Sequence, residues 1–193
     1  MYKKIIFVSC CVLITACTQQ PTKETQVILN IDSLVSSQSL LLKSLNAELQ
    51  KQLVMNGAKE EKKYRPDSLA WRTELDILRQ LTIINKPIYQ DLYTQEDNQL
   101  DSESNLKIRS YSTTQDVPVP VIKFYYRNSF ENLRRITSTY IEKNSLYKSE
   151  RHFDLEFLEE GQSIRLEKFK VTGFQKMILS DSVVYSLQLS IFR

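Results

Sequence analysis

Hydrophobic and polar positions alternate along short segments of residues 106–193. Ile122, Phe124 and Tyr126 are separated by Lys123 and Tyr125, and Phe153, Leu155 and Phe157 alternate with His152, Asp154 and Glu156. A period of two is typical of a strand that buries one face. Short turn segments at 143–145, 160–162 and 180–182 separate the alternating runs, which favours antiparallel neighbours. The pattern predicts an antiparallel meander of about six or seven strands.

The alternation changes phase once in this region. Ile164 and Leu166 begin one apolar series, whereas Phe169 and Val171 continue it one position later. An extra residue in one strand of a pair produces such a slip, so we expect a β-bulge near Glu167. Gly173 is predicted to be a second interruption.

Residues 30–56 show a helical spacing instead. Their apolar positions recur mostly in steps of three and four and end at Asn56-Gly57, a good helix stop, so the pattern predicts one long helix. The charged segment 58–65 is expected to be a linker. A heptad assignment places Gln38 and Gln52 in the apolar seam, which favours packing on a core over the alternative of an oligomerisation seam.

A second helix is predicted from Pro66, capped by Asp67 or Ser68 and ended near Lys86 by Pro87. A short further piece is expected up to residue 93, and the acidic segment 94–105 is predicted to be a polar loop. The fold class is therefore α+β, with two N-terminal helices packed on a C-terminal antiparallel sheet. One apolar face of the second helix carries Trp71, Leu75, Leu78, Leu81 and Ile84.

The N-terminus has the layout of a secretory signal. Lys3 and Lys4 precede an apolar run of about 12 residues, shorter than the roughly 20 that a membrane span requires. The run ends at Ile14-Thr15-Ala16-Cys17, which resembles the lipobox of bacterial lipoproteins. An ordinary secretion signal with an incidental cysteine is the alternative.

The resemblance implies cleavage between Ala16 and Cys17 and lipidation of the Cys17 thiol. It further implies the outer membrane, because no Asp follows the cysteine, and the periplasmic face, because the tether lacks an acidic run. We therefore divide the chain into a signal peptide (1–16), a lipidated tether (17–29) and one α+β domain (30–193). Within that domain, 30–93 is expected to be helical, 94–105 a loop and 106–193 the sheet.

Composition narrows the function classes. The formal net charge is +3, and loss of Lys3 and Lys4 with the signal would leave +1, so we expect no nucleic-acid partner. The only cysteines are Cys10, Cys11 and Cys17, which leaves the folded domain without thiols. With one histidine and three glycines, the chain offers neither a typical zinc site nor a phosphate-binding loop, and we expect no cofactor.

His152 is the only histidine, and Asp154 should lie on the same face of its strand. Such a pair can act as a general base, although a solvated cross-strand ladder is the favoured interpretation. We find no catalytic motif and expect a non-enzymatic protein. The polar face of the sheet is a candidate binding surface, with Lys123, Tyr125, Arg127, Lys148 and His152 as candidate contacts. Further basic or aromatic residues expected on that face are Lys107, Arg109, Tyr147 and Arg165.

Two functions are consistent with these observations. The first is a lipid-anchored envelope protein that binds another envelope protein, a glycan or a lipid through the sheet. The second is a carrier of lipid or another apolar ligand in a cavity between helices and sheet. The sequence leaves the ligand and the oligomeric state open.

Overall fold

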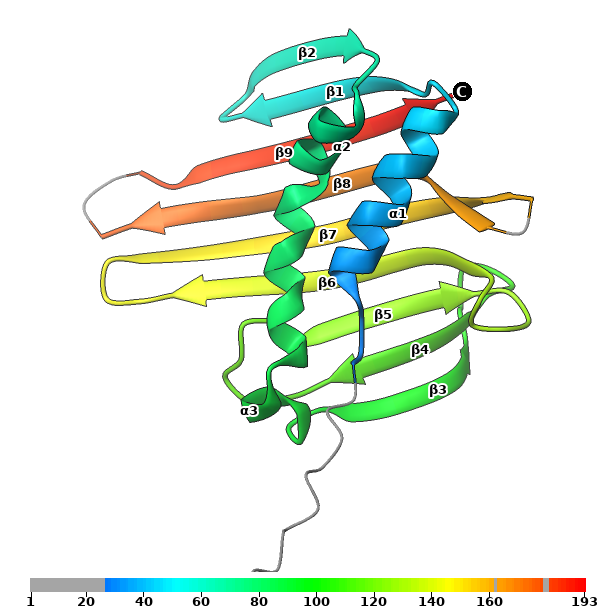
Figure 1. Ribbon diagram of the computed structural model, residues 1–193. Helices are drawn as coiled ribbons and strands as arrows, with labels where there is room; N and C mark the ends of the chain where they lie inside the picture. The colour runs from blue at the N-terminus through cyan, green and yellow to red at the C-terminus, as the bar shows by residue number, and fades with distance from the viewer. Residues whose placement is uncertain (1–26, 162, 179–180) are drawn as a thin grey trace, which may run out of the picture.

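The computed structural model describes residues 27–161, 163–178 and 181–193. One antiparallel sheet of nine strands, in the order β2-β1-β9-β8-β7-β6-β5-β4-β3, is covered on one face by helices (Figure 1). The α+β class is confirmed, and so is the meander, because β3 to β9 follow one another in the sheet. The count of six or seven strands is too low. The strands are β1 (Glu48–Met55), β2 (Ala58–Tyr64), β3 (Thr94–Leu100), β4 (Lys107–Ser112), β5 (Val121–Tyr126), β6 (Leu133–Lys143), β7 (Tyr147–Glu160), β8 (Ser163–Met177) and β9 (Val183–Phe192).

The first predicted helix is wrong beyond residue 44. Helix α1 (Ile31–Ser44) ends before Asn46, which has a positive φ of 50°, and Glu48–Met55 forms β1 instead. Leu49 and Leu53 were assigned to the helix because they continue a spacing of four. Four is also a multiple of the strand period, so these leucines equally share one face of a strand. Asn56-Gly57 forms the β1–β2 hairpin turn, with both residues at positive φ.

Neither of the two edge strands, β2 and β3, was predicted from the sequence. The supposed linker forms β2 and part of the supposed loop 94–105 forms β3, and nearly all of their side chains are exposed. An edge strand that packs on no core needs no apolar alternation. Charged edge strands also discourage pairing with other chains.

The second predicted helical region is confirmed. Helix α2 (Ser68–Leu75) is capped by Asp67, whose Oδ1 accepts a hydrogen bond from Ala70 N at 2.8 Å. It continues as the 3₁₀ helix η1 (Asp76–Asn85), and the short α3 (Pro87–Gln90) follows. All five residues of the predicted apolar face are buried, with Trp71 fully so.

The core lies between this helical layer and the sheet. Helix α1 and the α2–η1 segment lie side by side across the strands (Figure 1). Val35 and Leu42 of α1 are fully buried against the sheet, as expected for core packing. Among the described residues no helix lies on the opposite face of the sheet, and this face is called the open face below.

The predicted bulge is confirmed, whereas the predicted break at Gly173 is wrong. Glu156 pairs with Lys168 and Phe157 with Leu166, so Glu167 is the extra residue. Strand β8 continues through Gly173, where a Cβ atom would lie only 3.1 Å from the hydroxyl of Tyr185. The glycine leaves room for this side chain to cross β8 and accept a hydrogen bond from Arg151 Nε at 2.9 Å.

Candidate functional site

Cross-strand pairing brings polar residues of four strands together on the open face. Lys123, Thr137, Asp154 and Lys170 are successive partners across β5, β6, β7 and β8. Directly opposed side chains of antiparallel strands project from the same face. The next row along the strands contains Val121, Thr139, His152 and Thr172 in the same order.

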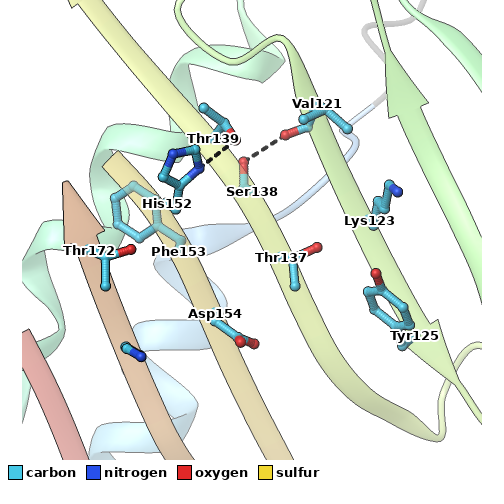
Figure 2. Close-up of a pocket in the computed structure, with 11 residues that line it drawn as sticks. Val121, Lys123, Tyr125, Thr137, Ser138, Thr139, His152, Phe153, Asp154 and Thr172 are labelled. Atoms are coloured by element: carbon cyan, nitrogen blue, oxygen red, sulfur yellow. Dashed lines mark hydrogen bonds between the residues drawn. The ribbon is translucent and has the colours of Figure 1, made fainter. Parts of the chain in front are cut away.

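A shallow hollow of about 310 Å³ lies over these two rows. In Figure 2, Lys123 and Tyr125 stand on β5 at one side, Thr172 stands on β8 at the other, and Thr137, Thr139 and His152 lie between. Of the predicted contacts, Lys123, Tyr125 and His152 line this hollow. Its full lining is Val121, Lys123, Tyr125, Thr137, Ser138, Thr139, His152, Phe153, Asp154, Lys170 and Thr172.

The His152 ring has a polar neighbour at each nitrogen. Nδ1 lies 3.1 Å from Thr139 Oγ1, and Nε2 lies 3.2 Å from Glu150 Oε1. The side chain is 55% exposed, so solvent reaches the ring. The expectation of an exposed cross-strand ladder agrees with these contacts.

Asp154 is engaged by Arg135. It lies on the same face as His152, as predicted, but its two oxygens accept hydrogen bonds of 2.7 Å each from Nε and Nη2 of Arg135. This bidentate contact raises the pKa of the Arg135 guanidinium. The carboxylate that contacts His152 is therefore Glu150.

Thr139, His152 and Glu150 contact one another in the order hydroxyl, imidazole and carboxylate, which is the order of the groups in a catalytic triad. Nucleophilic catalysis also needs donors for the developing oxyanion, which backbone amides commonly supply. Here β6 is paired on both sides, with β5 and β7, so the amides beside Thr139 are engaged in the sheet. The arrangement is suited to hydrogen bonding of a ligand rather than to nucleophilic catalysis.

The two lysines at the sides of the hollow have no ion pair or hydrogen bond within the described residues. Lys123 and Lys170 are both exposed and stand on β5 and β8, with β6 and β7 between them. Neighbouring strands lie about 4.8 Å apart, so the backbone positions of Lys123 and Lys170 are roughly 14 Å apart. Within the described part of the chain, the hollow thus offers two ammonium groups without partners, together with threonine hydroxyls and one imidazole.

The remaining two candidate contacts lie elsewhere. Lys148 lies near the start of β7, 5.7 Å above the Phe174 ring, and lines a separate hollow at the β6–β7 turn. Arg127 is exposed just after β5 and is not among the residues that line the central hollow. Lys148 shares the face of His152 but lies four residues earlier along β7, whereas Arg127 lies beyond the end of β5.

The prediction for Arg109 is wrong. Arg109 pairs with Phe124 on the helix-covered side, lies 4.2 Å from the Phe130 ring centroid and contacts Asp97 at 2.6 Å. Ile108 pairs with Tyr125 on the open face and is buried there. In β4 the core residue is Tyr111, so the assumed phase was inverted.

Arg165 is buried rather than solvated. It is 7% exposed, and its Nε lies 3.1 Å from Glu160 Oε2. Its guanidinium therefore takes part in a local ion pair at the end of the β7–β8 hairpin.

The sequence pattern did not single out four residues of this hollow, namely Thr137, Thr139, Thr172 and Lys170. Each lies at a polar position of an alternating strand, between buried neighbours such as Ile136, Phe169 and Val171. That alternation could have placed them on the open face. Their grouping depends on the register between strands, which alternation alone does not give.

Within residues 27–161, 163–178 and 181–193, no group of three or more metal-ligating side chains is found. Among the same residues, none of the helices combines the length and hydropathy that crossing a bilayer requires. Ala16 and Cys17, the expected cleavage and lipidation residues, lie outside the described part of the chain.

No protein-family model, curated protein or solved structure matches this chain.

Proposed function

We propose that this chain is a lipid-anchored protein of the bacterial cell envelope whose open face binds another envelope component without catalysing a reaction. The observation that carries the binding role is the hollow around His152, where Lys123 and Lys170, which have no ion pair among the described residues, flank several threonines. The resemblance of Ile14-Thr15-Ala16-Cys17 to a lipobox supports the anchor. The absence of Asp after Cys17 and of an acidic run in the tether supports the periplasmic face of the outer membrane.

The open face supports binding because it is polar and preformed. Hydrogen-bonded ladders hold its side chains on four neighbouring strands, so little order must be gained when a ligand binds. Ammonium groups and hydroxyls match a polar or anionic surface, such as that of a glycan or an acidic protein.

The carrier hypothesis has less support. An apolar ligand would need a cavity of several hundred Å³ between the helices and the sheet. At that interface Trp71, Phe153 and Phe169 are no more than 1% exposed and belong to one continuous core cluster. The side chains that could have lined a cavity instead pack on one another.

A photocrosslinking residue at Thr137, in the centre of the hollow, tests the binding role in intact cells. We expect it to capture a defined partner, whereas the same residue at the exposed Arg72 on α2 should not. The double variant Lys123→Glu and Lys170→Glu should reduce capture from Thr137. Lys62→Glu, on β2 and outside the hollow, is the matched control. Equal capture from Thr137 and Arg72 would contradict the assignment of the face.

The anchor is tested separately at Cys17. Wild-type protein should incorporate a radioactive fatty acid, lose about 16 residues on maturation and partition into detergent, because two or three acyl chains hold a protein stably at a bilayer. Cys17→Ser should abolish the label, because serine lacks the sulfur to which the diacylglyceryl group is attached. Wild-type protein that is cleaved but unlabelled would show an ordinary secretion signal.

A further inference from the structure

One end of the sheet exposes a series of large apolar side chains. Figure 1 shows α3, the β6–β7 turn and the end of β8 at the same end of the strands, at the left of the view. Ile88 and Ile178 there are 71% and 67% exposed. We call this series the apolar rim, and its members are Ile88, Leu92, Leu146, Met177 and Ile178.

Several contacts connect the elements that carry the rim. Ile178 N donates a hydrogen bond of 3.1 Å to Leu146 O, which joins the end of β8 to the β6–β7 turn. Leu146, Met177 and Ile178 line one hollow of about 220 Å³. Tyr89 of α3 lines another hollow with Lys143 at the end of β6, so α3 adjoins the same turn.

Lysines stand among these apolar side chains. Lys148 and Lys176 line the same hollow as Leu146, and Lys86 precedes Ile88. Lysine stems can lie along an apolar surface while the ammonium group reaches a polar layer. Exposed apolar side chains beside lysines are suited to the headgroup layer of a bilayer. There the apolar side chains can reach the acyl boundary while the ammonium groups contact the polar headgroups.

The entry of the chain into the fold brings a bilayer within reach of the rim. Ile28 N donates to Asn85 Oδ1 at 2.9 Å, and Asn85 lies two residues before Pro87, where α3 begins. Cys17 lies ten residues before Val27, and an extended tether of that length spans at most about 35 Å. From β3 to β8 the sheet measures roughly 24 Å, so the whole rim lies within that reach.

We propose that the apolar rim rests on the surface of the bilayer that holds the acyl anchor, a lipid contact that relies on the anchoring proposed above. A tethered surface meets the bilayer at high effective concentration, so contacts that are too weak to recruit a free protein suffice to orient this one. The strands then stand away from the bilayer, and the open face stays free for its partner.

A polarity-sensitive dye tests this contact in the anchored, full-length protein reconstituted in protein-free phospholipid vesicles. Leu146→Cys places the dye on the rim, and Leu158→Cys places it near the opposite end of β7, at a position that is 39% exposed. We expect a blue-shifted emission and quenching by brominated lipids from position 146 only. Equal spectra at both positions, with the acyl label present, would overturn the docking and leave the anchor intact.

A second dye position, combined with a substitution in the apolar rim, tests the same contact without relying on Leu146→Cys alone. With the dye at Asn144→Cys, the added change Ile178→Asp should reduce the shift, because a carboxylate resists entry into the apolar layer. A shift that requires added envelope proteins would assign the rim to a protein partner and overturn the proposal. Loss of acyl labelling in the wild type would overturn both the anchor and the docking.

Discussion

Gln38 of α1 and Leu166 of β8 are joined by a hydrogen bond of 2.7 Å from the backbone N–H of Leu166 to Oε1 of Gln38. The amide nitrogen of the same side chain donates to Ile164 O at 2.9 Å. Strand β9 pairs with β8 only from Lys168 onwards, so this part of β8 has no strand on that side. The glutamine therefore replaces a strand partner at the point where the bulge occurs.

Replacing Gln38 by Leu should destabilise the protein by about 2 kcal/mol, because Leu166 N–H and Ile164 C=O would be buried without partners. Thermal or denaturant unfolding measures the loss. Gln38→Glu keeps the oxygen that accepts from Leu166 N–H but removes the amide nitrogen that donates to Ile164 O. It therefore measures the second hydrogen bond separately from the first. An unchanged unfolding midpoint in Gln38→Leu would mean that water replaces the side chain.

Gly173→Ala should also destabilise the protein. An added Cβ would lie 2.3 Å from Glu150 O and 3.2 Å from Arg151 Cα, so the backbone of β7 or β8 must move. Such overpacking typically costs about 1–3 kcal/mol. Thr172→Ala, next to it but on the open face, is the control and should change the unfolding midpoint little.

The acid end of the stability curve should depend on Asp97. Hydrogen bonds from Arg109 and then from Tyr126 lower the pKa of Asp97 to about 2. A lowered pKa in the folded state adds stability above the unfolded value near pH 4, and this contribution is lost as the pH falls towards 2.

Asp97→Asn should therefore cost about 1 kcal/mol at pH 7, with partial exposure to water limiting the effect. The difference from wild type should shrink on titration to pH 2. Asp101→Asn, whose carboxylate accepts a hydrogen bond from Ser104, is a nearby control. A difference that does not vary between pH 7 and pH 2 would assign the effect to packing.

Leu189→Asp should unfold the domain. Leu189 is fully buried and pairs with Phe169 of β8, so the variant would bury an unpaired charge in the core. The cost exceeds about 3 kcal/mol, a large share of the usual 5–15 kcal/mol of a domain. Gln188→Asp places the same charge on the other face of β9 and should fold normally by circular dichroism.

How far the fold could be predicted from sequence depended on whether each strand buries a face. Strands β5, β7 and β9 were recognised because burial imposes alternation, as at Phe153, Leu155 and Phe157. At the edges, Lys59 to Lys63 of β2 are exposed on both faces, and no periodic signal arises. The Asn56-Gly57 pair was the one local signal for the β1–β2 hairpin.

The sequence predicted which face of the sheet carries the candidate site, but it did not predict which residues of that face lie close together. Lys123, Tyr125 and His152 were placed on the polar side of the sheet, and the structure brings them to one hollow. Lys148 shares a face with His152 but lies four residues earlier along β7. Register and distance along the strands decide which polar residues meet, and both are tertiary properties.

The pairing of β1 with β9 also determines when the sheet can be completed during synthesis. Leu49 is opposite Ile191, so the inner edge of the β1–β2 hairpin stays unpaired until residues 183–192 have left the ribosome. A two-stranded hairpin is marginal by itself, and contacts so distant in the chain form slowly. The order of the strands thus delays completion of the sheet until β9, the last strand in the sequence, has been synthesised and can insert between β1 and β8.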